Sequence, residues 1–495
     1  MTPALRFLGL EGQRLPLIID GEGEHVASDV VAKALSIAGS LAERGALQGE
    51  RVAILIEPGS LFIEALFGVW LAGGVALVLS PLHPTIERKY FCEDARVKRV
   101  LTSAAYESIA LEQAVPHIRA DIVATRASAF RPLLPAKDDA ALQLYTSGTT
   151  GKPKGAVLSH GNLATQQELV GDAWAVTQDD CLVHALPLHH MHGLCIAALT
   201  ALGRGASVNF LAKFSVKAIW ESFARGSIWM AVPTMTHKLL EEFAASDASK
   251  QRRFAASARA LRLCTSGSSA LPVSVGERWA DIAGEYPLER FGMTEIGVGS
   301  TNPLHGDRRP GTVGNPLPGV TTRIVDDAGN DGSEGELWVA GESVFLEYFE
   351  RPEANDAAFV SHNGLRYFRT GDTVTKDERG YLRILGRTSV DILKSGGYKL
   401  SALEIEEVLR EHPSVSDAAV VGLRDEVWGE RVVAAVTLRL GASSNTDALL
   451  AHCKERLAPY KCPRMIAIMN ELPRNALGKV MKPQLVNMLN VRTSL

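Results

Sequence analysis

The sequence has few cysteines, no long hydrophobic run and little excess of charge of either sign. Its six cysteines are scattered through 495 residues without a C-x-x-C pair. That spacing argues against a disulfide framework or a zinc site and predicts a reducing compartment. The longest uncharged apolar stretch, Ala65–Leu79, is too short to span a bilayer. The net charge of −4 gives no reason to expect nucleic acid or an anionic membrane as a partner.

The first twenty residues also lack a targeting pattern. They mix Arg6, Glu11 and Arg14 with short apolar pieces, so they contain neither the apolar core of a secretory signal nor the composition of a transit peptide. We therefore expect a cytoplasmic protein. Apolar residues make up 46% of the chain and charged residues 22%, as in ordinary globular proteins. A chain of this length exceeds one hydrophobic core, which predicts two or more domains.

Segments typical of strands and helices alternate through the N-terminal part of the chain. A helix is predicted at Leu61–Ala72, and buried strands are predicted at Arg51–Glu57, Val75–Leu79, Lys98–Thr102, Ala206–Leu211, Trp229–Val232 and Leu261–Cys264. This alternation is typical of parallel α/β layers. From about Gly311 glycine and proline become dense, and short strands such as Gly335–Ala340 indicate an antiparallel β-rich subdomain.

A domain boundary is predicted near Gly386-Arg387. Beyond it Ser401-Ala-Leu-Glu404 has the pattern of a capping box, which opens a helix. Two strands, at Ala418–Gly422 and Arg431–Leu440, and a second helix at Asp447–Leu457 would complete a small α+β domain. The sequence thus predicts a multidomain α/β protein, with a large domain over 1–386 and a small mobile α+β domain over 387–495.

The densest cluster of glycines, hydroxyls and lysines is the run Tyr145-Thr-Ser-Gly-Thr-Thr-Gly-Lys-Pro-Lys-Gly155, directly after the apolar stretch Ala140–Leu144. Glycines leave backbone amides uncovered, and consecutive amides bind anions. Lys152 and Lys154 add positive charge, so the predicted ligand is a polyphosphate. The run is no Walker A loop, because Pro153 precedes the lysine. The plainer alternative is a solvated turn.

Three further segments could complete a nucleotide site. Phe291-Gly-Met-Thr-Glu295 places a carboxylate after a glycine, which suits Mg²⁺ beside a phosphate. Thr370-Gly-Asp372, followed by Gly386-Arg387, offers an acceptor for the hydroxyls of a ribose. Near the C-terminus Lys479 follows a glycine. Each segment taken alone is also compatible with an ordinary turn or a surface side chain.

Three histidines lie within Leu186-Pro-Leu-His-His-Met-His-Gly-Leu194. A zinc site is one interpretation, although H-H-x-H in a loop has no recognised ligand spacing. A polar lining of a pocket is a second interpretation, and histidines satisfied by the backbone are a third. The residues alone do not choose among them.

In this order, the segments resemble the adenylate-forming superfamily, which contains acyl-CoA synthetases, firefly luciferase and the adenylation domains of peptide synthetases. The resemblance runs from Arg51 to Lys482 and implies ATP, Mg²⁺ and CoA as cofactor and substrates. It implies that the β- and γ-phosphates are held by Thr146, Ser147, Gly148, Thr149, Thr150 and Lys154, and that the adenine is bordered by Gly267, Ser268, Phe291 and Gly292. It also implies that Thr294 contacts the α-phosphate, that Glu295 holds Mg²⁺ and that Lys479 bridges the acid and the α-phosphate. The ribose would be bound by Asp372 and Arg387.

The resemblance also implies a second half-reaction, in which a thiol attacks the acyl-adenylate after the small domain has rotated. Ser395, Gly396, Gly397 and Glu404 would then complete the thioester-forming face. Two positions depart from the family pattern. Ser389 stands at the hinge, where Asp or Lys is usual, and Ala402 stands where proline is common. A hinge needs only to tolerate large backbone changes, so we expect switching to survive.

Arg290, with His190-Met-His192 and Met293 as further pocket residues, makes the chain similar to malonyl-CoA synthetases. A planar guanidinium can bind a second carboxylate with two hydrogen bonds, which predicts malonate or methylmalonate as the acid. The alternative is that Arg290 pairs with Glu289, but neighbouring residues on a strand point apart.

Two other functions stay open on the sequence. One is a synthetase for a medium-chain or aromatic monocarboxylate. The other is an adenylation enzyme that loads a free-standing carrier protein in place of CoA.

Overall fold

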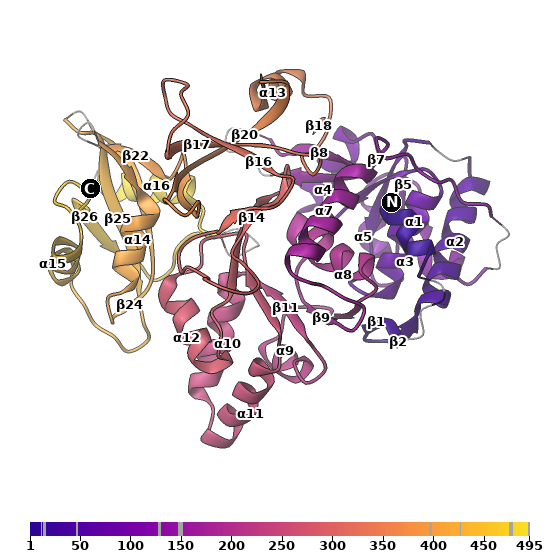
Figure 1. Cartoon of the computed structure of the whole chain (residues 1–495), viewed down its shortest axis with the longest axis horizontal. Helices are drawn as coiled ribbons and strands as arrows, with labels where there is room; N and C mark the ends of the chain where they lie inside the picture. The colour runs from indigo at the N-terminus through magenta and orange to yellow at the C-terminus, as the bar shows by residue number, and fades with distance from the viewer. Residues whose placement is uncertain are drawn as a thin grey trace.

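The computed structural model describes residues 1–10, 12, 16–45, 48–126, 130–146, 152–395, 398–425, 427–474 and 479–493, with only the backbone at 399 and 491–493. In Figure 1 the small C-terminal domain lies on the left, the N-terminal layer lies on the right, and the segment that contains α9–α12 projects below. The termini therefore lie at opposite ends of this view.

Two mostly parallel sheets form the large domain (Figure 1). The first has the order β18 (Glu347–Tyr348), β8 (Lys154–Ser159), β7 (Ala140–Thr146), β4 (Val75–Val78), β3 (Arg51–Leu55), β5 (Arg99–Thr102) and β6 (His117–Arg119). The second has the order β15 (Asn315–Pro316), β14 (Gly297–Thr301), β13 (Leu288–Met293), β12 (Leu263–Ser266), β11 (Ile228–Ala231), β9 (Cys181–His184), β10 (Ser207–Phe210), β1 (Pro16–Asp20) and β2 (Gly23–Val26). The predicted α/β layers are confirmed.

Helices connect and cover these strands. They are α1 (Pro3–Leu8), α2 (Ala27–Glu43), α3 (Ser60–Leu71), α4 (Thr85–Asp94), α5 (Glu107–Leu111), α6 (Ala120–Val123), α7 (His160–Ala173), the π-helical turn η1 (His192–Leu199), α8 (Thr200–Gly203), α9 (Val216–Ser222), α10 (Pro233–Ala245), α11 (Ala248–Arg259), α12 (Val273–Ala283) and α13 (Pro352–Ala358). Helix α3 is apolar on nearly every side because it is buried almost all round. Within the residues that the structure describes, no helix is long and apolar enough to cross a membrane.

The predicted β-rich subdomain is an antiparallel sheet. Its path runs through β16 (Thr321–Val325), β17 (Glu334–Ala340), β20 (Leu365–Lys376) and β19 (Phe359–His362), with β21 (Leu382–Arg387) paired to β20. The register sets Asp372 opposite Arg387, so the two predicted ribose-binding residues are cross-strand partners. Residues on directly opposite positions of antiparallel strands come within contact distance.

The small domain packs helices on a further sheet. Its strands are β23 (Tyr398–Ser401), β22 (Ile392–Ser395), β25 (Gly429–Leu438), β24 (Val415–Asp425) and β26 (Met465–Ile468), and its helices are α14 (Ala402–Arg410), α15 (Thr446–Arg456) and α16 (Lys482–Thr493). The sequence patterns identified α14, β24, β25 and α15 but missed the β22–β23 hairpin, β26 and α16. Helix α16 has no clear apolar period, which explains its omission.

The buried core divides along the chain. One cluster of buried apolar side chains extends from Ala4 to Leu382, and two others lie between Leu393 and Leu489. The predicted domain boundary near residue 386 falls between Leu382 and Leu393, where one cluster ends and the next begins. The exact residue of the boundary stays a prediction.

Two local predictions need correction. The strand predicted at Leu261–Cys264 begins at Leu263 and ends at Ser266, because the chain leaves helix α11 only just before it. The predicted capping box is half formed. Ser401 Oγ accepts a hydrogen bond from Glu404 N at 3.2 Å, but the Glu404 carboxylate is held by Lys461 instead.

Candidate active site

The predicted phosphate loop falls between the antiparallel strands β7 and β8 in the chain. The last residue of β7, Thr146, pairs with the first residue of β8, Lys154. The ammonium of Lys154 lies 4.7 Å from the centre of the Tyr348 ring. Ser147, Gly148, Thr149 and Thr150 lie outside the described residues. Thr146 and Lys154 are therefore the predicted phosphate-binding residues of this segment that the structure describes.

Glu295 lies in the turn that joins β13 to β14, next to Thr294. Its carboxylate is buried and accepts a hydrogen bond of 2.8 Å from Tyr348 Oη. Burial raises the pKa of Glu295, while the Tyr348 hydroxyl and the cations of Arg387 and Lys154 lower it. Glu295 and Lys154 thus share Tyr348 as a neighbour. Tyr348, in β18, is a site residue that the sequence did not indicate.

The residues around Glu295 fit a magnesium ion bound together with phosphate. Mg²⁺ in nucleotide enzymes uses one or two carboxylates and takes its other ligands from water and substrate phosphate. A single buried carboxylate beside a lysine matches that pattern. Among the described residues no group of three or more His, Cys, Asp or Glu side chains could hold a metal by itself.

Asp372 and Arg387 form the next part of the site. Arg387 Nε lies 3.1 Å from Asp372 Oδ1, and the other oxygen of this carboxylate, Oδ2, is buried without a hydrogen-bond partner among the described residues. Burial raises the pKa of Asp372 to about 6, against the lowering effects of Arg387 and Lys479. Lys479, from the small domain, is thus one of the cations that act on this carboxyl of the large domain. The orphaned oxygen leaves an acceptor for a hydroxyl group.

Arg290 is buried on β13 and points away from its neighbour Glu289. Its Nε and Nη2 have no hydrogen-bond partner among the described residues. Glu289 Oε1 instead accepts from Gly311 N at 2.8 Å, which excludes the alternative that the two side chains pair. Burial lowers the pKa of Arg290 to about 10, so the guanidinium stays charged at neutral pH. A buried, unsatisfied cation of this kind is costly unless an anion binds it.

Gly267 lies against the Arg290 guanidinium, and the charge of Arg290 also acts on His192, which contacts Ser268. A Cβ on Gly267 would lie 2.6 Å from Arg290 Cζ, so a larger residue there would displace the Arg290 guanidinium. His192 Nδ1 and Ser268 Oγ are 3.0 Å apart, and Ser268 has the strained φ of +70°. Burial and then the Arg290 charge hold the pKa of His192 well below its usual range, so this imidazole is neutral. We call Arg290, His192, Gly267 and Ser268 the guanidinium pocket.

The remaining predicted residues of this region lie close by. Phe291, Gly292 and Met293 continue β13 and are half-buried, and backbone of β14 covers Gly292. The rings of His190 and His189 are 4.1 Å apart, and burial lowers the pKa of His190 to about 4. Among the residues that the structure describes, no group of three or more His, Cys, Asp or Glu side chains could hold a metal, so these histidines form no zinc site there.

The predicted thioester-forming face lies on the small domain. Ser395 is buried at the end of β22, and Glu404 accepts bonds of 2.7 and 2.8 Å from Lys461 Nζ. Gly396 and Gly397 lie outside the described residues. The exposed rings of Tyr398 and Tyr460 stack 4.4 Å apart, a feature without a sequence signal. The predicted hinge residue, Ser389, is exposed in the turn after β21.

Comparisons with known proteins agree with this arrangement. Residues 15–349 match the family model described as AMP-binding enzyme, and residues 404–479 match the one described as AMP-binding enzyme C-terminal domain. The mitochondrial malonate–CoA ligase ACSF3 of Bos taurus is 39% identical, covering 97% of this chain and 89% of its own length.

Solved structures of similar proteins can be compared with this chain over almost its whole length. ATP-bound MatB from Rhodopseudomonas palustris is 34% identical, with a TM-score of 0.90 over 99% of each chain. Apo MatB from the same organism is 35% identical over the same shares, with a TM-score of 0.81. The fold described above is therefore more similar to the ATP-bound form. From its sequence, its fold and the grouping of its site residues, the chain belongs to the AMP-binding, adenylate-forming enzyme family.

Proposed function

We propose that this protein is an ATP-dependent, AMP-forming acyl-CoA synthetase for a short dicarboxylate, malonate or methylmalonate. The observation that carries the proposal is the buried Arg290 guanidinium, which has unsatisfied nitrogens among the described residues and a neutral His192 beside it. A relative named malonate–CoA ligase and the MatB structures support the same reaction class.

In the first half-reaction one carboxylate of the acid attacks the α-phosphorus of ATP. A new P–O bond forms, the bond to pyrophosphate breaks, and an acyl-adenylate results. Two anions must approach each other, so cations in the site supply most of the stabilisation. Lys154 would neutralise the β- and γ-phosphates and Lys479 the reacting carboxylate and α-phosphate. A magnesium ion held by Glu295 would supply further charge neutralisation on the phosphates.

In the second half-reaction the CoA thiol attacks the acyl carbonyl, and AMP leaves with the electrons of the C–O bond. Ser395 and Glu404, with the Gly396-Gly397 segment, would form the face of the small domain that receives the thiol. The stacked pair Tyr398–Tyr460 and the Lys461 ammonium lie on the same face and suit a ligand with a planar base and phosphates. A carrier protein in place of CoA remains the alternative acceptor.

The guanidinium pocket would select the acid by its second carboxylate. A pocket built around a charged donor rejects an analogue without the matching acceptor, because the donor then stays buried and unpaired. Butyrate presents a methyl group where malonate presents a carboxylate. His192, neutral and hydrogen-bonded to Ser268, would not compete with Arg290 for the anion.

The proposal is tested by pyrophosphate release with ATP, Mg²⁺ and CoA, comparing malonate, methylmalonate, butyrate and benzoate. We expect malonate or methylmalonate to give the highest kcat/KM. Replacing CoA with a holo-carrier protein in the same assay separates the two acceptors. Preference for butyrate or benzoate would retain the adenylate-forming chemistry and overturn the role of Arg290.

Binding of ATP is expected to weaken as the pH falls below about 6. Asp372 must be ionised to accept hydrogen bonds from the ribose hydroxyls, and its buried carboxyl has a pKa of about 6. At pH 5 about a tenth of the sites are ionised, so the Kd for ATP rises about tenfold from its value at neutral pH. Titration calorimetry of wild type and Asp372→Asn measures this. Protonation of ATP itself affects the Kd of both proteins equally and therefore cancels in the comparison. If the Kd for ATP changed with pH in the same way in wild type and Asp372→Asn, the prediction would be contradicted.

The cytoplasmic location predicted from the sequence stays a proposal. The Bos taurus relative is named mitochondrial, so fractionation of the source cells is needed to assign the compartment of this chain.

A further inference from the structure

A carboxylate of the small domain contacts the large domain at the start of a helix. Glu407, on α14, accepts a hydrogen bond of 2.9 Å from the backbone N–H of Val273, the first residue of α12. The two residues are 134 positions apart in the chain. The first amides of a helix have no partner inside the helix and carry partial positive charge. Glu407 therefore supplies both a missing acceptor and a favourable charge across the domain interface.

A second observation places Glu407 against the large domain. Burial, with a further contribution from Glu407, raises the pKa of Glu289 on β13 to about 8. The charge of Glu407 therefore acts on a carboxyl group of the large domain. Glu289 directly precedes Arg290, so the small domain meets the large one on the strand that forms the guanidinium pocket.

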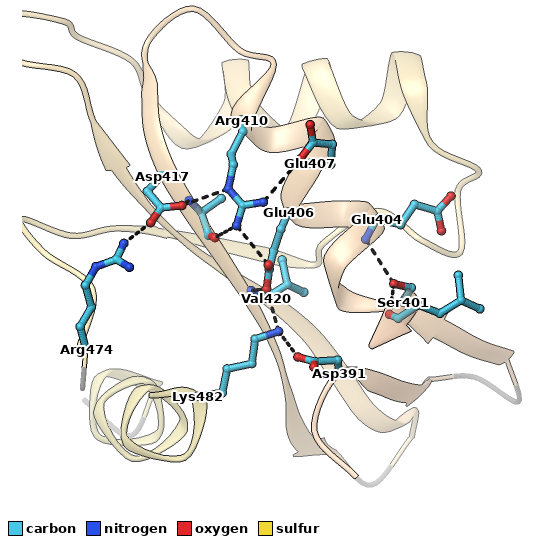
Figure 2. A network of polar contacts seen from close by, with 12 residues as sticks. Asp391, Ser401, Glu404, Glu406, Glu407, Arg410, Asp417, Val420, Arg474 and Lys482 are labelled. Atoms are coloured by element: carbon cyan, nitrogen blue, oxygen red, sulfur yellow. Dashed lines mark hydrogen bonds and ion pairs between the residues drawn. The ribbon is translucent and has the colours of Figure 1, made fainter. Parts of the chain in front are cut away.

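Helix α14 is held to the rest of the small domain by a network of ion pairs (Figure 2). Arg410, one turn beyond Glu407, lies 3.7 Å from Glu407 Oε2, 3.2 Å from Glu406 Oε2 and 3.0 Å from Asp417 Oδ1. Asp417 is on β24 and also pairs with Arg474. These ion pairs tie the helix that carries Glu407 to the sheet of the small domain.

The same network reaches the segment that carries Lys479. Figure 2 shows the Lys482 ammonium between Asp391 and Glu406, at 2.5 and 2.7 Å. Lys482 is buried and is the first residue of α16, shortly after Lys479 in the chain. Asp391 in turn accepts from Arg387 N at 3.0 Å. Ion pairs therefore connect Glu407, through Arg410 and Glu406, with the start of α16.

We infer that Glu407 is a positioning residue for adenylate formation. Its hydrogen bond to the first amide of α12 holds the small domain against the large domain in the present arrangement. This inference rests on the proposed function, because it assigns Glu407 to one of the two half-reactions. The higher similarity to ATP-bound than to apo MatB agrees with such an arrangement.

The test separates the two half-reactions in Glu407→Ala, Glu407→Gln and a control, Glu411→Gln. Glu411 follows on the same helix but pairs with Arg456 within the small domain, at 3.5 Å, and is half exposed. ATP–pyrophosphate exchange with malonate reports adenylate formation. Thioester formation from supplied malonyl-adenylate and CoA reports the second step.

We expect exchange to fall about tenfold in Glu407→Ala, which corresponds to the loss of one charge-assisted hydrogen bond. Glu407→Gln, which keeps an acceptor but not the charge, should lie between that variant and wild type. Thioester formation from supplied adenylate should be unchanged or faster in both. An equal loss in both half-reactions would show that Glu407 has only a general structural role. An unchanged rate of ATP–pyrophosphate exchange in Glu407→Ala would overturn the inference.

Hydrogen exchange provides a readout that needs no activity. The amide of Val273 should exchange faster in Glu407→Ala than in wild type or Glu411→Gln, because its acceptor is gone. If the wild-type protein released no pyrophosphate with any acid, the proposed function would fail. Independently of activity, an unaltered hydrogen-exchange rate at the Val273 amide in Glu407→Ala would refute the contact.

Discussion

Replacing Arg290 with alanine is expected to lower kcat/KM for malonate by two to three orders of magnitude. Truncating one partner of a buried charge pair costs about 2–5 kcal/mol, much of it from leaving the other charge unpaired. Here the malonate carboxylate would be left without its donor. The kcat/KM for butyrate should stay the same or rise, because the variant no longer buries an unpaired guanidinium beside a methyl group. Steady-state pyrophosphate release with both acids measures the change in preference.

Two further variants sharpen this test. Arg290→Lys keeps the charge but loses the planar pair of donors, so malonate activity should be intermediate. Arg369→Ala is the control, because Arg369 is exposed and pairs with Glu336 at 2.8 Å. It should leave both acids unaffected. An equal fall for malonate and butyrate in Arg290→Ala would indicate damage to the fold and contradict the specificity role.

Replacing Lys479 with alanine is expected to slow ATP–pyrophosphate exchange about a hundredfold to a thousandfold, the usual cost of removing one preorganised charge-stabilising group. The physical reason is the charge of the Lys479 ammonium, which lowers the pKa of Asp372 on the large domain. This cation can screen the approach of the acid to the α-phosphate. Thioester formation from supplied malonyl-adenylate should change little, since that step needs no such screening.

Lys454→Ala is the matched control for Lys479→Ala. Lys454 is exposed in the last turn of α15 and should be replaceable without effect. Unchanged exchange in Lys479→Ala would contradict the proposed mechanism. An equal loss in both half-reactions would assign Lys479 to the stability of the small domain instead.

Much of the site was predictable because its parts are local patterns. The phosphate loop is one continuous run of glycines, hydroxyls and lysines. Strand and helix periods set the layers on which Glu295 and Arg290 lie, and the alternation of a strand explains why Arg290 and Glu289 point apart. The sequence likewise placed Asp372 and Arg387 near each other in the chain, and a hairpin register makes them neighbours.

The sequence by itself determined the α/β layers with a small α+β domain, the residue types proposed for the nucleotide site and the arginine proposed to select the acid. Only the tertiary structure decided that Tyr348 meets Glu295, that Ser268 holds His192, and that Glu407 binds the first amide of α12. Periodicity reports which face of an element is buried, not which distant element covers it. The two residues of these three contacts are separated in the chain by 53, 76 and 134 positions, respectively. Such contacts depend on how whole layers and domains pack.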